Sequence, residues 1–200
     1  MTYPDFFDTI DIIKVKDPLS QVLGAFLMGE YEFSYLDVVK SAGHSCPTVA
    51  GAYIITLEAL KALYPNQRAV RGNIKVEFEE SLEEGVAGVI SNVISQITGA
   101  TDKSGFKGLQ GQFARHSLMS FDKDISNASA RFTRLDNGKA ISVTYNPEAV
   151  KANPKMMKLM KTLGSGEARP QDVKEFGVMW QDRVKRIFEN IDAVVEVSEF

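Results

Sequence analysis

A long apolar run between Pro47 and Pro65 constrains the fold of this chain more than any other feature. Apolar residues recur in it at steps of three and four, which is the spacing of one helix face. Further apolar residues stand on the opposite face, so we expect burial on more than one side. Proline suits the first turn of a helix, because its φ is already helical and it has no N–H to leave unpaired. The sequence therefore predicts a central buried helix that starts at Pro47 and ends before Pro65.

The only cysteine and one of the two histidines directly precede this helix, in the Gly-His-Ser-Cys-Pro motif at residues 43–47. Cys46 is then expected at the helix N-terminus, where unpaired N–H groups and the helix dipole stabilise an anion. A thiolate is the nucleophilic and metal-binding form of cysteine, and His44 adds a second ligand or a base. We therefore take His44 and Cys46 as candidate catalytic or metal-binding residues. A lone cysteine is also common as a small buried core residue, and the sequence leaves that alternative open.

The segment at residues 43–53 resembles the signature of the E-subunit family of formylmethanofuran dehydrogenase. A weaker match follows at residues 97–101, with Gly105 and Gly108 after it. The resemblance covers roughly residues 35–145. It implies an α+β domain that binds a metal ion, commonly zinc, through the His and Cys region, and it implies a homodimer.

The chain departs from the family pattern in its ligand-type residues. Ala100 stands where family members often carry a cysteine, and Asn92 stands where an acidic residue is expected. The cysteine pairs that many members carry near the C-terminus are missing from the sequence. The resemblance therefore implies a single-domain branch without the C-terminal zinc-ribbon segment and with a reduced or altered ligand set.

A metal site needs more ligands than His44 and Cys46 supply, because structural zinc has four protein ligands and catalytic zinc has three plus a water. His116, the second histidine, is the candidate third ligand, and its segment at residues 113–121 is predicted to be a strand. The expected cofactor is a divalent metal ion, zinc first, with haem or another iron centre as the minor alternative.

Gly105, Lys107 and Gly108 lie in a glycine- and lysine-rich loop that we predict at residues 101–111. Backbone N–H groups in such a loop can bind an anion, so these three are candidate cofactor-binding residues. A flexible lid over a pocket at Cys46 is an equally open interpretation.

The remaining pattern predicts an α+β fold with a mixed or antiparallel sheet. Residues 73–79 alternate between apolar and polar, as a half-buried strand does. Residues 130–145 indicate a hairpin about an Asn-Gly pair, which favours a type I′ turn. In that register Phe132 faces Val143 and Ala130 faces Tyr145. A short extended piece is predicted at residues 31–35, and helices are predicted at residues 19–26, 37–42, 85–98, 147–163 and 170–191.

We divide the chain into an α+β domain at residues 1–146, which carries the family resemblance, and a C-terminal helical extension at residues 147–200 that packs on it. The extension carries two helices. The second begins at Pro170, and its apolar stripe covers either the core or a second copy of the chain. The resemblance favours a homodimer.

Composition restricts the class of protein. The net charge of −3 provides no basic excess for nucleic acid. A single cysteine excludes an internal disulfide framework and fits a reducing compartment. The N-terminus lacks the pattern of a secretory signal, and no apolar run is long enough to span a membrane. We therefore expect a cytoplasmic protein with neither nucleic acid nor a membrane as a partner.

Two functions remain after these exclusions. The first is a small metal- or cofactor-binding protein in which His44 and Cys46 bind the metal and the glycine loop closes the pocket. The second is an enzyme in which Cys46 is the nucleophile or redox centre and His44 or His116 is its base. Both functions include a small-molecule or cofactor ligand, and the sequence does not identify it.

Overall fold

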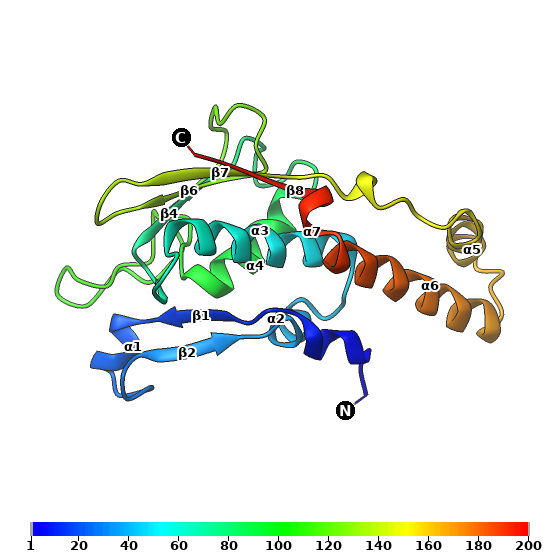
Figure 1. The fold of residues 1–200 in the computed structure, drawn as a ribbon, viewed down its shortest axis with the longest axis horizontal. Coiled ribbons are helices and arrows are strands. Elements are labelled where there is room, and N and C mark those ends of the chain that lie inside the picture. The colour runs from blue at the N-terminus through cyan, green and yellow to red at the C-terminus, as the bar shows by residue number, and fades with distance from the viewer. Residues whose placement is uncertain (1, 200) are drawn as a thin grey trace.

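The computed structural model describes residues 2–199 and has an α+β fold, as the sequence predicted. Two sheets enclose a central helical layer (Figure 1). That layer consists of α3 (Pro47–Leu63) and α4 (Ala87–Thr98), which pack against each other. Each predicted position of these two helices is therefore confirmed, including the start at Pro47.

The smaller sheet has the strand order β2-β1-β3, with β1 antiparallel to β2 and parallel to β3. The larger sheet has the order β5-β4-β6-β7-β8, and only its β4–β5 pair is parallel. The strands are β1 (Ile13–Lys16), β2 (Glu30–Phe33), β3 (Ala69–Val70), β4 (Ile74–Glu77), β5 (Met119–Ser120), β6 (Ala130–Arg134), β7 (Ala140–Tyr145) and β8 (Val195–Glu199). Both sheets are therefore mixed.

Helix α3 is the centre of the core, and twelve of its residues are buried. One close contact fixes its position under the larger sheet. The ring of Tyr145 lies so near Gly51 that a Cβ there would come within 2.2 Å of the ring atom Cε1. Gly51 is therefore required for packing, because any side chain would displace the tyrosine.

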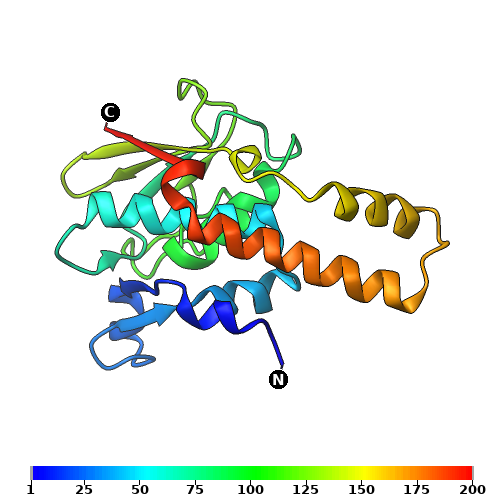
Figure 2. The same ribbon diagram turned by 45° about the vertical axis from the view of Figure 1, so that its right-hand side comes forward.

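The remaining helices lie around this layered body. They are η1 (Asp5–Thr9), α1 (Pro18–Val22), α2 (Tyr35–Ala42), η2 (Pro147–Ala149), α5 (Pro154–Gly164), α6 (Pro170–Glu189) and α7 (Ile191–Val194). Figures 1 and 2 show α5 and the first half of α6 extending away from the body as an arm. The second half of α6 packs in the core, where Val184 and Ile187 are buried, whereas Val173 and Val178 on the arm are exposed. The stripe of α6 thus covers the core of its own chain along half its length.

Four local predictions are wrong. The helix predicted at residues 19–26 ends at Val22, as α1, and turns follow it. Residues 113–121 do not form one strand: Phe113 and Ser117 have positive φ, and only Met119–Ser120 pairs with β4. His116 therefore lies in a turn. The hairpin register is shifted by two, so that Phe132 faces Ile141 and Ala130 faces Val143.

The hairpin shift arises because residues 135–139 form a longer loop in place of a two-residue type I′ turn; Gly138 alone in that loop has positive φ. The helix predicted at residues 147–163 is interrupted as well. It consists of the short η2 and the separate α5, which begins at Pro154 and is capped by the Asn153 side chain.

The C-terminal segment is more than a helical extension, because β8 pairs with β7 and completes the larger sheet. The division at residue 146 and the homodimer stay predictions. No helix within residues 2–199 is long and apolar enough to cross a membrane.

Candidate functional site

Ser45 fixes the Gly-His-Ser-Cys-Pro motif to the rest of the protein. Its side chain is buried, and its Oγ lies 2.9 Å from the Tyr35 hydroxyl and donates to Gln181 Oε1 at 3.0 Å. Its carbonyl oxygen accepts from Trp180 Nε1 at 2.9 Å and from Gln181 Nε2. Burial raises the pKa of Tyr35 far above its ordinary value, so the hydroxyl stays protonated. Neutral hydrogen bonds from α2 and α6 therefore hold the turn before α3.

His44 is exposed, and its ring orientation is set by one contact. Nδ1 lies 3.0 Å from the carbonyl oxygen of Ala42. Because a carbonyl oxygen can only accept, Nδ1 carries the proton, and Nε2 of the neutral ring is left with a free lone pair. A backbone carbonyl holding one ring nitrogen while the other stays free is the usual arrangement around a metal-binding histidine.

His44 also lines a pocket of about 500 Å³ between α2 and α4. The other lining residues are uncharged, namely Ser41, Ala42, Val89, Asn92, Val93, Ser95 and Gln96. Asn92, where the family resemblance expects an acidic residue, is therefore brought beside His44 by the fold. The pocket offers hydroxyl and amide groups around an imidazole.

Cys46 is half-buried and forms the N-cap of α3. Its Sγ accepts a hydrogen bond from the backbone N–H of Val49 at 3.3 Å. The sequence expectation that this cysteine lies at a helix N-terminus is confirmed. The contact satisfies one of the orphan donors of the helix, so Cys46 has a structural role whatever else it does.

His116 lies in the turn before β5, where its Nδ1 is 3.0 Å from Ser117 Oγ. Within residues 2–199, no three His, Cys, Asp or Glu side chains are grouped closely enough to hold a metal ion. The fold therefore does not bring His116 together with His44 and Cys46. The imidazole and thiol at residues 44 and 46 suit zinc in kind, but a metal there needs further ligands from water, a small molecule or a second chain.

The glycine loop has structural constraints of its own. A Cβ at Gly105 would come within 1.6 Å of Thr101 Oγ1, and Gly108 has a φ of +100°. Neither glycine lines the His44 pocket, and Lys107 is exposed away from it. Only the start of the loop comes near, where Thr101 and Asp102 border a small cleft on the other side of Asn92. The role of the loop as a lid or anion site stays a prediction.

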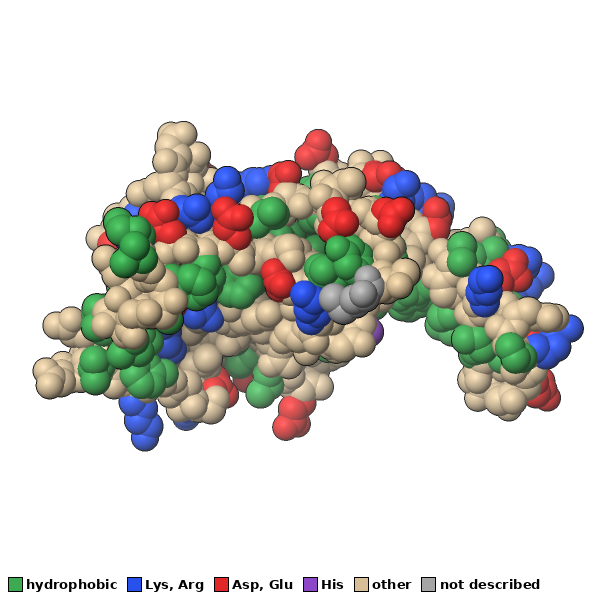
Figure 3. Space-filling model, turned by 90° about the horizontal axis from the view of Figure 1, so that it is seen from below, with side chains coloured by type: hydrophobic (Ala, Val, Ile, Leu, Met, Phe, Trp, Pro, Cys, Tyr) green, Lys and Arg blue, Asp and Glu red, His purple; other side chains and the backbone are tan. Residues whose placement is uncertain are grey.

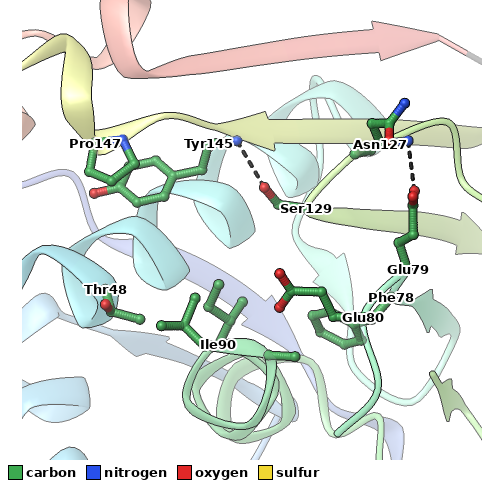
Figure 4. A pocket seen from close by; sticks show the side chains of 12 residues that line it. Thr48, Phe78, Glu79, Glu80, Ile90, Asn127, Ser129, Tyr145 and Pro147 are labelled. Atoms are coloured by element: carbon green, nitrogen blue, oxygen red, sulfur yellow. Dashed lines mark hydrogen bonds between the residues drawn. The ribbon is translucent and has the colours of Figure 1, made fainter. Parts of the chain in front are cut away.

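A second pocket, of about 410 Å³, lies on the other side of the motif, where α3 and α4 begin. Figure 4 shows the ring of Tyr145 above it, Ile90 below it and the Glu80 carboxylate pointing into it. The Tyr145 hydroxyl donates to the carbonyl oxygen of Pro47 at 2.7 Å, and burial raises the pKa of this phenol far above its ordinary value. Ser129 Oγ accepts from the Tyr145 N–H.

The charged side chains that line this second pocket are both carboxylates, Glu79 and Glu80. Glu79 accepts a hydrogen bond from the Asn127 N–H at 2.6 Å, whereas Glu80 has no side-chain partner within the described chain. With Phe78 and Ile90 on the walls, the pocket suits an apolar ligand that carries a cationic group. The alternation at residues 73–79 predicted a strand but did not indicate that Glu79 and Glu80 border a pocket. Only the meeting of β4, α4 and β7 makes a pocket there.

No protein-family model matches this chain, and no curated protein matches it either. The resemblance to the E-subunit family of formylmethanofuran dehydrogenase therefore stays a prediction that rests on the motif at residues 43–53.

Proposed function

We propose that this chain is a small metal- or cofactor-binding protein, as the family resemblance implies, and that its ligand binds in the pocket beside His44. The observation that carries this proposal is the imidazole of His44. It is exposed, its Nδ1–H is held by the Ala42 carbonyl, and it lines a pocket of about 500 Å³. A free Nε2 in such a place serves as a metal ligand or as a proton acceptor.

The rest of the pocket restricts the class of ligand. Asn92 and Gln96 offer amide groups, Ser41 and Ser95 offer hydroxyl groups, and no carboxylate or ammonium group lines the wall. An uncharged polar molecule with a small apolar part fits this lining, because its hydrogen-bonding groups find partners and no buried charge is left unpaired. Where a divalent metal binds as well, His44 and Cys46 supply two ligands and the small molecule or water supplies the others.

The proposal is tested by comparing the zinc affinity of the unaltered protein with that of the His44→Ala and His116→Ala variants. We expect His44→Ala to weaken zinc binding about 10-fold or more in a competition titration with a chelating indicator, on the scale of changes to a metal site. His116→Ala is the matched control, because it removes the other imidazole, which the fold places elsewhere, and it should bind zinc as the unaltered protein does. Equal affinity in all three proteins overturns the proposal. Equal loss in the two variants shows instead that both histidines bind the metal.

Thiol chemistry at Cys46 is a second candidate function, favoured by one contact. The backbone N–H of Val49 donates to Sγ, so the sulfur lies at the N-terminus of α3. No hydrogen bond joins His44 to Cys46 within the described chain, so a base is not positioned for it. Alkylation of the metal-free protein by iodoacetamide at pH 7 separates the two functions. A rate well above that of free cysteine favours the enzyme, and a rate equal to or below it contradicts the enzyme.

A further inference from the structure

One end of the molecule presents two loops that expose large apolar side chains. We define the apolar tip as residues 18–29, which contain α1, together with residues 103–114 of the glycine loop. Leu27 is 91% exposed and Leu23 is 64% exposed. The exposed apolar residues of the tip are Val22, Leu23, Phe26, Leu27, Met28, Phe106 and Leu109. Figure 3 shows hydrophobic side chains gathered at the end of the molecule where Figure 1 places α1.

The first loop of the tip is held in a fixed shape at its base. The Asp17 carboxylate accepts from the N–H groups of Leu19 and Ser20, and the Asp17 N–H donates to the carbonyl oxygen of Gly29 at 2.7 Å. Gly29 has a φ of +67°, and a Cβ there would come within 2.5 Å of Asp17 O. The Phe26 ring stacks on Tyr31 at a centroid distance of 4.6 Å. These contacts fix the backbone of the loop, and its apolar side chains are exposed in that fixed conformation.

The same aspartate joins the second loop to the first. Arg115 Nη2 donates to Asp17 Oδ1 at 2.6 Å, and both side chains are buried. The Arg115 guanidinium fills the space beside Gly72 and Gly99, where a Cβ on either glycine would come within 2.5 Å of Nη1. The Arg115 N–H also donates to the carbonyl oxygen of Phe106. Figures 1 and 2 both place the two loops at the same end of the molecule.

The charge of the tip differs from that of the whole chain. The chain has a net charge of −3, yet residues 18–29 and 103–114 contain no aspartate or glutamate. They contain Lys103 and Lys107, which are exposed and form no ion pair within the described chain. None of the exposed apolar residues of the tip lines a pocket described above. The tip is therefore an exposed apolar surface whose own charged side chains are both basic, with Asp102 and Glu30 at its borders.

We propose that the apolar tip inserts into the surface of a membrane that contains anionic phospholipids. Clusters of exposed large apolar side chains mark interaction sites, and a membrane surface needs no complementary groove on the protein. The leucine, phenylalanine and methionine side chains reach the acyl boundary, and the two lysines stay among the phosphates. The chain lies on the membrane and does not span it. The sequence analysis expected no membrane partner, because no apolar run is long enough to span a bilayer.

Vesicle flotation tests this proposal directly. We expect the full chain to float with vesicles of phosphatidylcholine and phosphatidylglycerol and to stay in solution with phosphatidylcholine alone. A Leu23→Ser/Leu27→Ser variant should lose this binding, because it removes two of the most exposed apolar side chains. Leu135→Ser is the matched control, since Leu135 is 51% exposed in the β6–β7 loop. Circular dichroism establishes that each variant is folded.

The lysines are tested separately. Each lysine near an anionic surface contributes about fivefold to the affinity. The Lys103→Gln/Lys107→Gln variant should therefore bind the mixed vesicles about 25-fold more weakly, and its binding should depend less on salt. No flotation of the unaltered protein overturns the proposal, and so does equal flotation of the Leu23→Ser/Leu27→Ser variant. Concentration-dependent self-association that this variant abolishes, without flotation, also overturns it and assigns the tip to a second copy of the chain.

Discussion

The turn before α3 and the apolar tip are each held by a buried polar network, but the two networks differ in charge. Ser45 holds the turn through neutral hydrogen bonds with Tyr35, Trp180 and Gln181. Asp17 holds the tip through ion pairs with Arg71, at 3.0 Å, and with Arg115. The turn exposes an imidazole beside a pocket, whereas the tip exposes apolar side chains.

The difference teaches what each network tolerates. A neutral network loses about 1–3 kcal/mol when one buried partner becomes unsatisfied. A buried ion pair loses more when one partner is removed, because the remaining charge stays in a medium that solvates it poorly. We therefore expect the tip to be the more sensitive of the two regions to single substitutions, and its pH dependence to be the stronger.

Asp17→Asn is expected to have the largest effect. It keeps the shape of the side chain but leaves Arg115 buried without a counter-charge, so the free energy of unfolding should fall by about 3–5 kcal/mol. Urea denaturation measures this change. Asp136→Asn is the control, since it removes one carboxylate of an exposed ion pair with Arg134. A loss at Asp17 as small as the loss at Asp136 would show that the charged network does not hold the tip.

The pH dependence of this network has a defined sign. Burial alone would raise the pKa of Asp17, but the charge of Arg115 and the hydrogen bonds from Arg71, Ser20 and Tyr31 outweigh it and lower the pKa below its ordinary value. Because the pKa of Asp17 is lower in the native state than in the unfolded chain, the ionised carboxylate stabilises the fold at pH values above its unfolded pKa of about 4. This stabilisation is lost as the pH falls through the native pKa. The stability difference between the unaltered protein and Asp17→Asn should therefore shrink below about pH 4. A difference that is constant from pH 6 to pH 3 contradicts this assignment.

Ser45→Ala is expected to have an intermediate effect. It leaves the Tyr35 hydroxyl and Gln181 Oε1 without their common partner, while the contact of Trp180 with the backbone carbonyl remains. The free energy of unfolding should fall by about 1–3 kcal/mol. Ser198→Ala, on the exposed face of β8, should change it little. If Ser45→Ala lowers the free energy of unfolding as much as Asp17→Asn does, the expected difference between the two networks is wrong.

Cys46→Ser is expected to have the smallest effect on stability. Serine is a favoured N-cap, so its hydroxyl can accept the Val49 N–H in place of Sγ and the fold stays intact. Zinc content should nevertheless fall strongly, because the thiolate is the softest ligand in the motif. Metal analysis and circular dichroism of the purified variant measure both outcomes. Unchanged metal content together with an unchanged spectrum rules Cys46 out as a ligand.

Local pattern was sufficient to predict the elements whose burial is visible in the sequence. Helices α3 and α4 and strand β4 were predicted because their apolar spacing is unambiguous. The shifted hairpin kept its inward face, since a shift of two residues preserves which side chains point to the core. Strands β1, β3 and β8 were missed, because each is short and is defined by pairing with distant segments.

The candidate site divides in the same way. The positions of His44 and Cys46 at the start of α3 followed from the motif, because the cap and the proline are local signals. The packing of α4 and β7 brings Asn92 to the pocket of His44 and Glu80 to the pocket of Tyr145. Local sequence patterns do not predict such tertiary packing. The pairing of Asp17 with Arg115 spans 98 residues and was not predictable from spacing.

The state of the two imidazoles tests the central claim most directly, because the chain has only two histidines and their ring signals can be assigned with one substitution. Nitrogen-resolved NMR at a pH where both rings are neutral should show His44 protonated at Nδ1 and free at Nε2. On addition of zinc, the His44 signals should shift and the His116 signals should stay in place. A His44 ring that is protonated at Nε2, or a His44 signal that zinc does not move, would contradict the account.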